Sequence, residues 1–162
     1  MKIERIIVNA SPLIVLFKAG FSELLPQLFT DILVPVAVWD EVLAGGATDT
    51  AARTLPATAW LKRVEVSALP PILTAWDLGP GESQVLSLAL DNPGAGVVID
   101  DAAARRCAAT LRVPLLGTGG ILVLAKRRGL IGSMAASLDE LRNAGLWLSD
   151  DIANLLIKLA GE

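Results

Sequence analysis

The sequence predicts an α/β fold, a three-layer sandwich in which a mainly parallel central sheet has helices on both faces. Short segments rich in β-branched residues alternate with amphipathic helical segments along the chain, as in strands joined by crossover helices. Apolar residues make up 53% of the 162 residues, which suits strands that are buried on both faces. Because no repeat, linker or low-complexity tract divides the chain, we expect a single domain over residues 1–162.

The predicted strands are short segments enriched in β-branched residues. They lie at residues 3–8, 31–34, 63–66, 96–99 and 113–116. The longest apolar run, residues 113–125, is interrupted by Gly-Thr-Gly-Gly and is shorter than the roughly 18–20 residues of a membrane-spanning helix. The apolar segment near residue 1 lacks the cleavage site of a signal peptide. We therefore expect a soluble, cytoplasmic protein with no membrane contact.

Capping residues mark the predicted helices. In the first helix, Ser11 is the expected N-cap, Pro12 takes the first helical position and Gly20 ends the helix. The other helices are expected at residues 22–29, 35–46, 50–55, 82–92, 102–111, 119–130, 133–143 and 149–159.

The composition restricts the chemistry available to this protein. The chain has no His and no Tyr, which excludes Ser-His-Asp triads, His general bases and His-bound zinc. Its one cysteine, Cys107, cannot form an internal disulfide, and no His is present to activate it. Carboxylates and other oxygen groups remain. The formal net charge is -3, so contact with a nucleic acid would need a local basic patch.

Several polar residues occupy positions where chemistry is expected. In a parallel α/β sheet, ligands bind beyond the carboxyl ends of the strands. The polar residues at such ends, or on the helices beside them, are Asn9, Ser11, Glu41, Glu82, Asp100 and Asp101.

Each of these residues also has a purely structural interpretation. Glu82 can stabilise the dipole at the start of its helix, and Asp101 can cap the helix that follows it. Asn9 and Ser11 suit an Asx turn and an N-cap, and Glu41 suits a solvent-facing position on an amphipathic helix. Asp100 directly precedes Asp101, and the capping of one helix does not require both aspartates.

Basic residues gather in the second half of the chain. Arg105 stands one helical turn after Asp101, so a local ion pair explains it; alternatively, Arg105 and Lys126 contact the phosphates of a nucleic acid. Thr118 is followed by two glycines, and it either caps a helix or leaves backbone amides free to bind a phosphate. Such a phosphate would belong to a nucleic acid or to a small molecule. The four tryptophans are not interleaved with Lys or Arg, so no base-stacking platform is expected.

Four segments resemble, in the same order, those of the PIN domain, a family of metal-dependent ribonucleases that includes toxins of toxin-antitoxin pairs. They are IIVNASPLI, VWDEVLAGG, GPGESQVLSLAL and VVIDDAAARRCA, and they extend over nearly the whole chain. The resemblance implies endoribonuclease activity on RNA with Mg2+ or Mn2+ as cofactor. It also implies a homodimer and, for a toxin, an antitoxin protein as partner.

The resemblance implies roles for individual residues. The catalytic carboxylates would be Glu41, Glu82 and Asp101, and the metal ligands Asn9, Glu41, Glu82, Asp100 and Asp101. Substrate contacts would come from Ser11, Arg105, Thr118 and Lys126. Asn9 stands where nuclease members usually carry Asp, which removes one negative charge from the site. The alternative is therefore a catalytically weak PIN-like module that binds a nucleic acid or a protein.

Overall fold

The computed structural model describes residues 2–162 and contains a five-stranded sheet in which every neighbouring pair of strands is parallel. The strands are β1 (Arg5–Val8), β2 (Asp31–Pro35), β3 (Leu61–Val64), β4 (Gly96–Val98) and β5 (Leu115–Leu116), in the order β3-β2-β1-β4-β5. The chain adds β2 and β3 on one side of β1, then β4 and β5 on the other. The strand order therefore reverses between β1 and β4, where ligands of such sheets bind.

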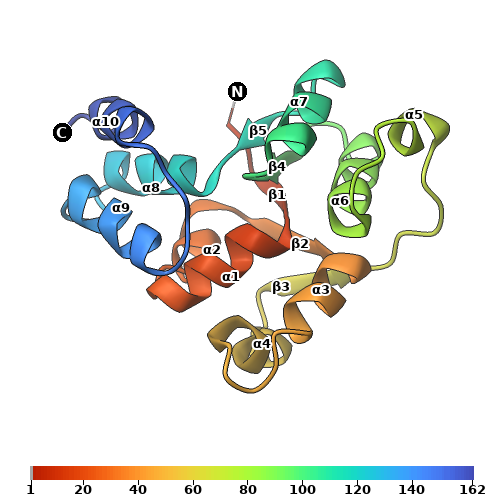
Figure 1. Ribbon diagram of the computed structural model, residues 1–162, viewed down its shortest axis with the longest axis horizontal. Coiled ribbons are helices and arrows are strands. Elements are labelled where there is room, and N and C mark those ends of the chain that lie inside the picture. The colour runs from red at the N-terminus through yellow and green to blue at the C-terminus, as the bar shows by residue number, and fades with distance from the viewer. Residues whose placement is uncertain (1) are drawn as a thin grey trace.

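Helices lie on both sides of this sheet. They are α1 (Ala10–Ala19), α2 (Leu24–Leu28), α3 (Val36–Leu43), α4 (Thr50–Thr54), the short 3-10 helix η1 (Leu55–Ala57), α5 (Pro71–Thr74), α6 (Pro80–Asp91), α7 (Ala102–Thr110), α8 (Thr118–Arg127), α9 (Met134–Asn143) and α10 (Asp150–Leu159). Figure 1 shows α6 and α7 on one side of the strands and α1, α2 and α8 on the other. The predicted α/β sandwich is thereby confirmed. Within residues 2–162, none of the helices has the length and apolar character needed to cross a membrane.

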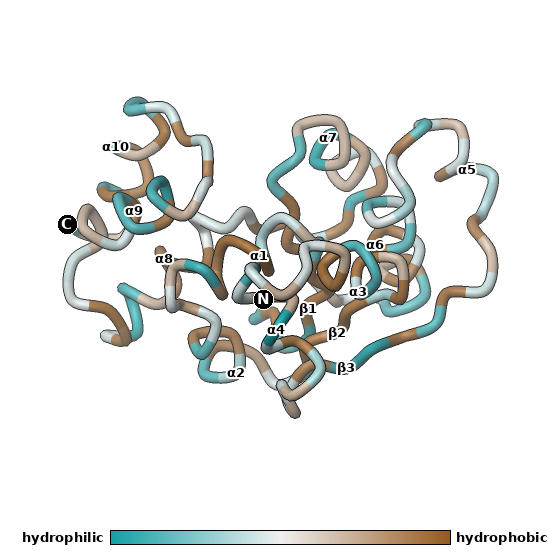
Figure 2. Tube along the Cα trace, turned by 60° about the horizontal axis from the view of Figure 1, so that its bottom comes forward, coloured by the Kyte–Doolittle hydropathy of each residue, from teal (hydrophilic) through white to brown (hydrophobic). Residues whose placement is uncertain are grey.

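The two central strands form the middle of the hydrophobic core. Ile6 and Val8 of β1 and Val97 and Val98 of β4 have no exposed surface. Figure 2 shows the hydrophobic colour along β1 and β2, inside the shell of helices. Burial on both faces explains why these strands are almost entirely apolar and why polar groups first appear after they end.

Most predicted elements are present, with shifted ends. The first helix begins at Ala10, before the predicted N-cap Ser11, and Asn9 takes the N-cap position instead. The third strand begins at Leu61, two residues earlier than predicted, because Leu61 is buried and pairs with Ile32 of β2. The short α5, at the Pro70-Pro71 pair, is absent from the sequence prediction.

Candidate functional site

The carboxyl ends of β1 and β4 lie side by side. The backbone N–H of Asn9 donates to the carbonyl oxygen of Val98 at 3.1 Å, which continues the ladder in which Val8 pairs with Val98. The residue after β1 is thus held next to the turn that carries Asp100. The topology therefore brings two of the predicted polar segments to one edge of the sheet.

Asn9 is buried, with 3% of its surface exposed, although a polar side chain is costly to bury. It occupies the N-cap position of α1, but its side chain makes no capping hydrogen bond. Its Nδ2 donates to Glu82 Oε1 at 3.4 Å, and its Oδ1 is a buried acceptor with no hydrogen-bond partner among residues 2–162. Leaving a buried acceptor unpaired costs about 1–3 kcal/mol, so capping does not account for this residue.

Glu82 and Glu41 come from two helices that pack against each other, α6 and α3. The backbone N–H of Ala37, at the start of α3, donates to Gln84 Oε1 at 2.9 Å and fixes the two helices at this point. Gly81 lies in between: a Cβ atom on Gly81 would stand 3.3 Å from Asn9 Oδ1 and 4.0 Å from Glu41 Oε2. Three oxygen-bearing side chains thus gather around the first turn of α6.

This group, which we call the Asn9 group (Asn9, Glu41 and Glu82), carries uncompensated negative charge. Glu41 is exposed, as its solvent-facing interpretation predicts. Its pKa is nevertheless raised above the ordinary value, first by partial desolvation and then by the nearby charge of Glu82. Within residues 2–162 no salt bridge involves either glutamate. A positive charge at this position would therefore be stabilising.

Asp100 has different partners. Its Oδ1 accepts the backbone N–H of Thr118 at 2.9 Å, and its Oδ2 accepts the hydroxyl of Thr118, which is fully buried. These bonds join the turn after β4 to the N-terminus of α8. Thr118, predicted to contact substrate, thus holds Asp100 in place.

Asp101 and Arg105 also make local contacts within the same turn. Asp101 is the N-cap of α7 and accepts the backbone N–H of Ala104 at 2.9 Å, as its structural interpretation predicts. Arg105 donates from Nη1 to the carbonyl oxygen of Ile99 at 2.8 Å, and no Asp101–Arg105 salt bridge is present in residues 2–162. The predicted ion pair is therefore replaced by a bond from the guanidinium to the backbone.

Within residues 2–162, the two remaining predicted residues, Ser11 and Lys126, make no hydrogen bond or salt bridge with the Asn9 group. Ser11 is exposed in the first turn of α1. Lys126 lies at the other end of α8 from Thr118, about 12 Å along the helix axis, where it forms a salt bridge with Glu162 at 3.4 Å. The amine of Lys126 also donates to the carbonyl oxygen of Gly132. These contacts give Lys126 a structural role in joining α8 to the C-terminal helices.

The donor set of the Asn9 group fits a hard divalent cation such as Mg2+ or Mn2+. Across residues 2–162, no three acidic or cysteine side chains stand close enough together to hold a metal ion. The Asn9 group nevertheless offers two carboxylates and an unpaired amide oxygen, and hard cations prefer such oxygen ligands. Asp100 and Asp101, also predicted as ligands, accept the hydrogen bonds described above: both oxygens of Asp100 and Oδ2 of Asp101 take part.

Gly81 and Gln84 are residues that the sequence analysis does not single out. Gly81 leaves room for Asn9 Oδ1, and Gln84 ties α6 to α3. A glycine in a helical first turn and a glutamine three residues further on carry no local signal of such a role. Only the packing of α3 against α6 assigns it to them.

The fold and this edge of the sheet define a class of protein: a parallel α/β protein with oxygen ligands gathered where its strand order reverses. Residues 5–162 match the model of a family that is described as a PIN domain. The chain therefore belongs to the PIN domain family, which has a nuclease-like fold. No match to a curated protein was found.

Proposed function

We propose that this protein is a metal-dependent endoribonuclease that hydrolyses RNA phosphodiester bonds at the Asn9 group. Membership of the PIN domain family supports a nuclease-like activity. The observation that carries the proposal is the buried, unpaired Oδ1 of Asn9 beside Glu41 and Glu82. A buried acceptor next to two carboxylates is costly unless a cation binds there, so this arrangement favours a metal site.

In this proposal each residue of the group has a distinct role. Asn9 Oδ1 and the carboxylate of Glu82 would hold the cation, and Glu41 lies beside them. A bound divalent cation supplies positive charge and lowers the pKa of water. Glu41 would accept the proton of the attacking water, and the oxygen that leaves the phosphorus would take a proton from solvent water.

Cleavage of a labelled single-stranded RNA in the presence of Mn2+ tests the proposal. Glu82→Gln preserves the shape of the side chain and removes its charge, and we expect the rate to fall by about 100-fold or more. Glu140→Gln, at an exposed position on α9, is the matched control and should cleave at the wild-type rate. Equal cleavage by wild type and Glu82→Gln would contradict the proposed site.

Asp101→Ala distinguishes a catalytic role of Asp101 from capping. If Asp101 only caps α7, the variant loses stability, about 1 kcal/mol, and retains cleavage at temperatures where it is folded. If Asp101 is a catalytic carboxylate, cleavage is lost in the folded protein. Circular dichroism at the assay temperature separates the two outcomes.

A second candidate function is an RNA-binding module without catalysis. The hydrogen bond from Asn9 to Glu82 favours this second function. The uncharged amide of Asn9, in place of a carboxylate, lowers the negative charge of the group and donates to Glu82 without a metal. This alternative predicts RNA binding without cleavage. It also predicts no rise in melting temperature up to millimolar Mn2+, whereas a ligand at 100 times its Kd stabilises by about 2.7 kcal/mol.

The finer part of the proposal is that the nuclease is the toxin of a toxin-antitoxin pair. Expression of the wild-type chain in a bacterial host should then arrest growth, and expression of Glu82→Gln at the same level should not. Equal growth of the two cultures, with the RNA cleavage of the wild type intact, would exclude the toxin role and leave the nuclease proposal standing.

A further inference from the structure

A cleft of about 460 Å³ opens beside Asp100, on the β5 side of the sheet edge. This volume lies within the range of small-ligand sites. One wall is apolar and comes from α10 and the segment before it; it includes Leu146, Trp147, Leu148, Ile152 and Leu156. The other wall, which we call the polar wall because it carries Asp100 and Arg105, comes from the ends of β4 and β5, the start of α8 and, for Arg105, α7. It also includes Leu115, Leu116, Gly117, Gly119 and Gly120.

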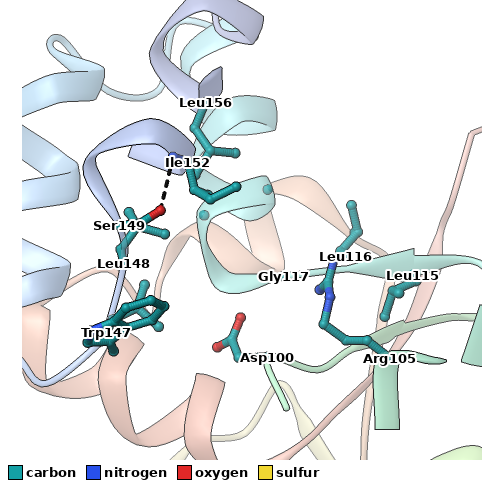
Figure 3. A pocket seen from close by; sticks show the side chains of 13 residues that line it. Asp100, Arg105, Leu115, Leu116, Gly117, Trp147, Leu148, Ser149, Ile152 and Leu156 are labelled. Carbon is teal, nitrogen blue, oxygen red and sulfur yellow. Dashed lines mark hydrogen bonds between the residues drawn. The ribbon is translucent and has the colours of Figure 1, made fainter. Parts of the chain in front are cut away.

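Trp147 is the most exposed large apolar side chain described, with 86% of its surface exposed. Figure 3 shows Trp147 and Asp100 bordering the same open space, with Ile152 and Leu156 above it and Arg105 on the β5 side. The segment that carries Trp147 is fixed at its end, since the hydroxyl of Ser149 caps α10 by accepting the N–H of Ile152 at 3.2 Å. An exposed indole on a supported segment can stack with a flat ring that enters the cleft.

The polar wall retains free hydrogen-bonding capacity. The guanidinium of Arg105 has five N–H groups, and within residues 2–162 it donates one hydrogen bond, to the carbonyl oxygen of Ile99. A Cβ on Gly117 would stand 3.0 Å from Arg105 Nη1 and 3.2 Å from Asp100 Oδ1, so both side chains border this glycine. Each oxygen of Asp100 accepts one bond from Thr118 and can accept a second.

The cleft thus offers an aromatic face on one side and both donors and acceptors on the other. A nucleobase has the matching features, a flat ring with donors and acceptors along its edge. A free phosphate fits less well, because the carboxylate of Asp100 lines the cleft. The position of the cleft also allows one strand of RNA to reach both sites. Asn9 directly follows β1, the cleft lies beside β5, and only β4 separates these two strands.

We infer that this cleft binds a nucleobase of single-stranded RNA, with the base stacked on Trp147 and its edge or adjoining phosphate in contact with Arg105. The inference rests on the proposed function in taking RNA as the substrate, and it adds a binding subsite next to the Asn9 group. Trp147 and Arg105 are distant in sequence, which is why the absence of interleaved Trp and basic residues does not exclude a stacking site.

Fluorescence anisotropy with a labelled single-stranded RNA octamer, measured in EDTA, tests the inference in the full chain. We expect Trp147→Ala to bind roughly 5- to 150-fold more weakly, the range measured for loss of one stacked base. Trp147→Phe, which retains an aromatic ring, should restore most of the affinity. Ile72→Ala is the matched control, because Ile72 is also an exposed apolar residue, 52% exposed, and lies on α5.

An octamer of the same length in which abasic sites replace the bases separates stacking from phosphate contacts. The wild type should bind the abasic octamer more weakly than the RNA, and Trp147→Ala should show a smaller difference between the two. Wild-type affinity of Trp147→Ala for the RNA, or equal affinity of the wild type for both octamers, would overturn the inference. If Trp147→Ala loses only self-association, as measured by light scattering, the cleft is a protein-docking surface and the inference is also wrong.

The EDTA assay keeps this inference separate from the nuclease proposal. If Trp147→Ala weakens RNA binding but no preparation cleaves RNA with Mn2+, the subsite stands and the catalytic proposal fails. If Glu82→Gln abolishes cleavage but Trp147→Ala binds and cleaves like the wild type, the catalytic proposal stands and the subsite fails.

Discussion

Two groups of acidic side chains at the same sheet edge differ in how their oxygens are satisfied. Asp100 accepts a backbone N–H and a buried hydroxyl from Thr118. In the Asn9 group, by contrast, Glu82 receives a single 3.4 Å bond from Asn9, and Asn9 Oδ1 has no partner among residues 2–162. The comparison indicates that the Asp100–Thr118 pair supports the fold, whereas the Asn9 group keeps a buried, unpaired acceptor among residues 2–162, which the proposed cation would satisfy.

The largest expected effect comes from breaking the satisfied pair. Thr118→Val removes a fully buried hydroxyl that donates to Asp100, so the free energy of unfolding should fall by about 1–3 kcal/mol, with or without metal. Urea unfolding measures the change. Thr110→Val is the control, because the hydroxyl of Thr110 is exposed and bonds only to the carbonyl oxygen of Arg106. Equal stability of the two variants would show that the pair contributes little.

The next effect, that of Asn9→Asp on stability, depends on whether a divalent metal is present. Asn9→Asp replaces the donor to Glu82 by a third carboxylate of the group, so in EDTA we expect a loss of about 1–2 kcal/mol from like-charge repulsion and a lost hydrogen bond. Mn2+ should then raise the melting temperature of this variant more than that of the wild type. Asn154→Asp, exposed on α10, is the matched control. An Asn9→Asp protein whose melting temperature ignores Mn2+ would count against a metal at the Asn9 group.

A smaller effect on stability accompanies Gly81→Ala. The new Cβ would stand 3.3 Å from Asn9 Oδ1 and 3.4 Å from Val38 Cγ2, so these tight contacts lower the stability. The higher helix propensity of Ala offsets up to about 1 kcal/mol of this loss. We therefore expect a nearly unchanged melting temperature and weaker Mn2+ binding by calorimetry. Gly120→Ala, whose Cβ would meet Leu116 at 3.6 Å, controls for propensity and should bind Mn2+ normally.

The smallest expected effect is on the pH dependence of stability. It compares Glu162, whose carboxylate accepts hydrogen bonds, with Glu41, which accepts none within residues 2–162. Glu162 accepts the N–H groups of Met134 and Ala135 and pairs with Lys126, which holds its pKa below the ordinary value. Its contribution is therefore present above the pKa of the unfolded chain and is lost as the pH falls through the lowered value. Glu162→Gln should make metal-free stability less sensitive to acid.

Glu41 should show the opposite slope. Because its pKa is raised in the folded protein, the folded state holds the proton more tightly than the unfolded chain does. Metal-free stability should therefore fall as the pH rises from the ordinary glutamate value through the raised one. Glu41→Gln removes this fall. Chemical unfolding in EDTA over this pH range measures both slopes, and two variants with the same slope would contradict the contrast between the acids.

Local sequence patterns were sufficient for the order of the strands and of most helices, because strand and helix signals depend on residues close together in the chain; they missed the short α5. The apolar run before Asn9 and the one before Asp100 indicate buried strands, and the residues after them are where a parallel sheet exposes polar groups. The ends were less well predicted. Leu61 joins β3 because its partner Ile32 lies in another strand, which a local pattern does not report.

The sequence by itself determined the fold class, the exclusion of His-based chemistry, and the candidate acids near the sheet edge. Only the tertiary structure decided which of these acids converge: Glu41 and Glu82 with Asn9, and Asp100 with Thr118. Likewise, only the packing of α10 against α8 and α9 sets Trp147, just before α10, and Arg105 in one cleft. The physical reason is that composition and periodicity report on neighbours along the chain, whereas a site is made by side chains from separate elements whose contacts depend on packing.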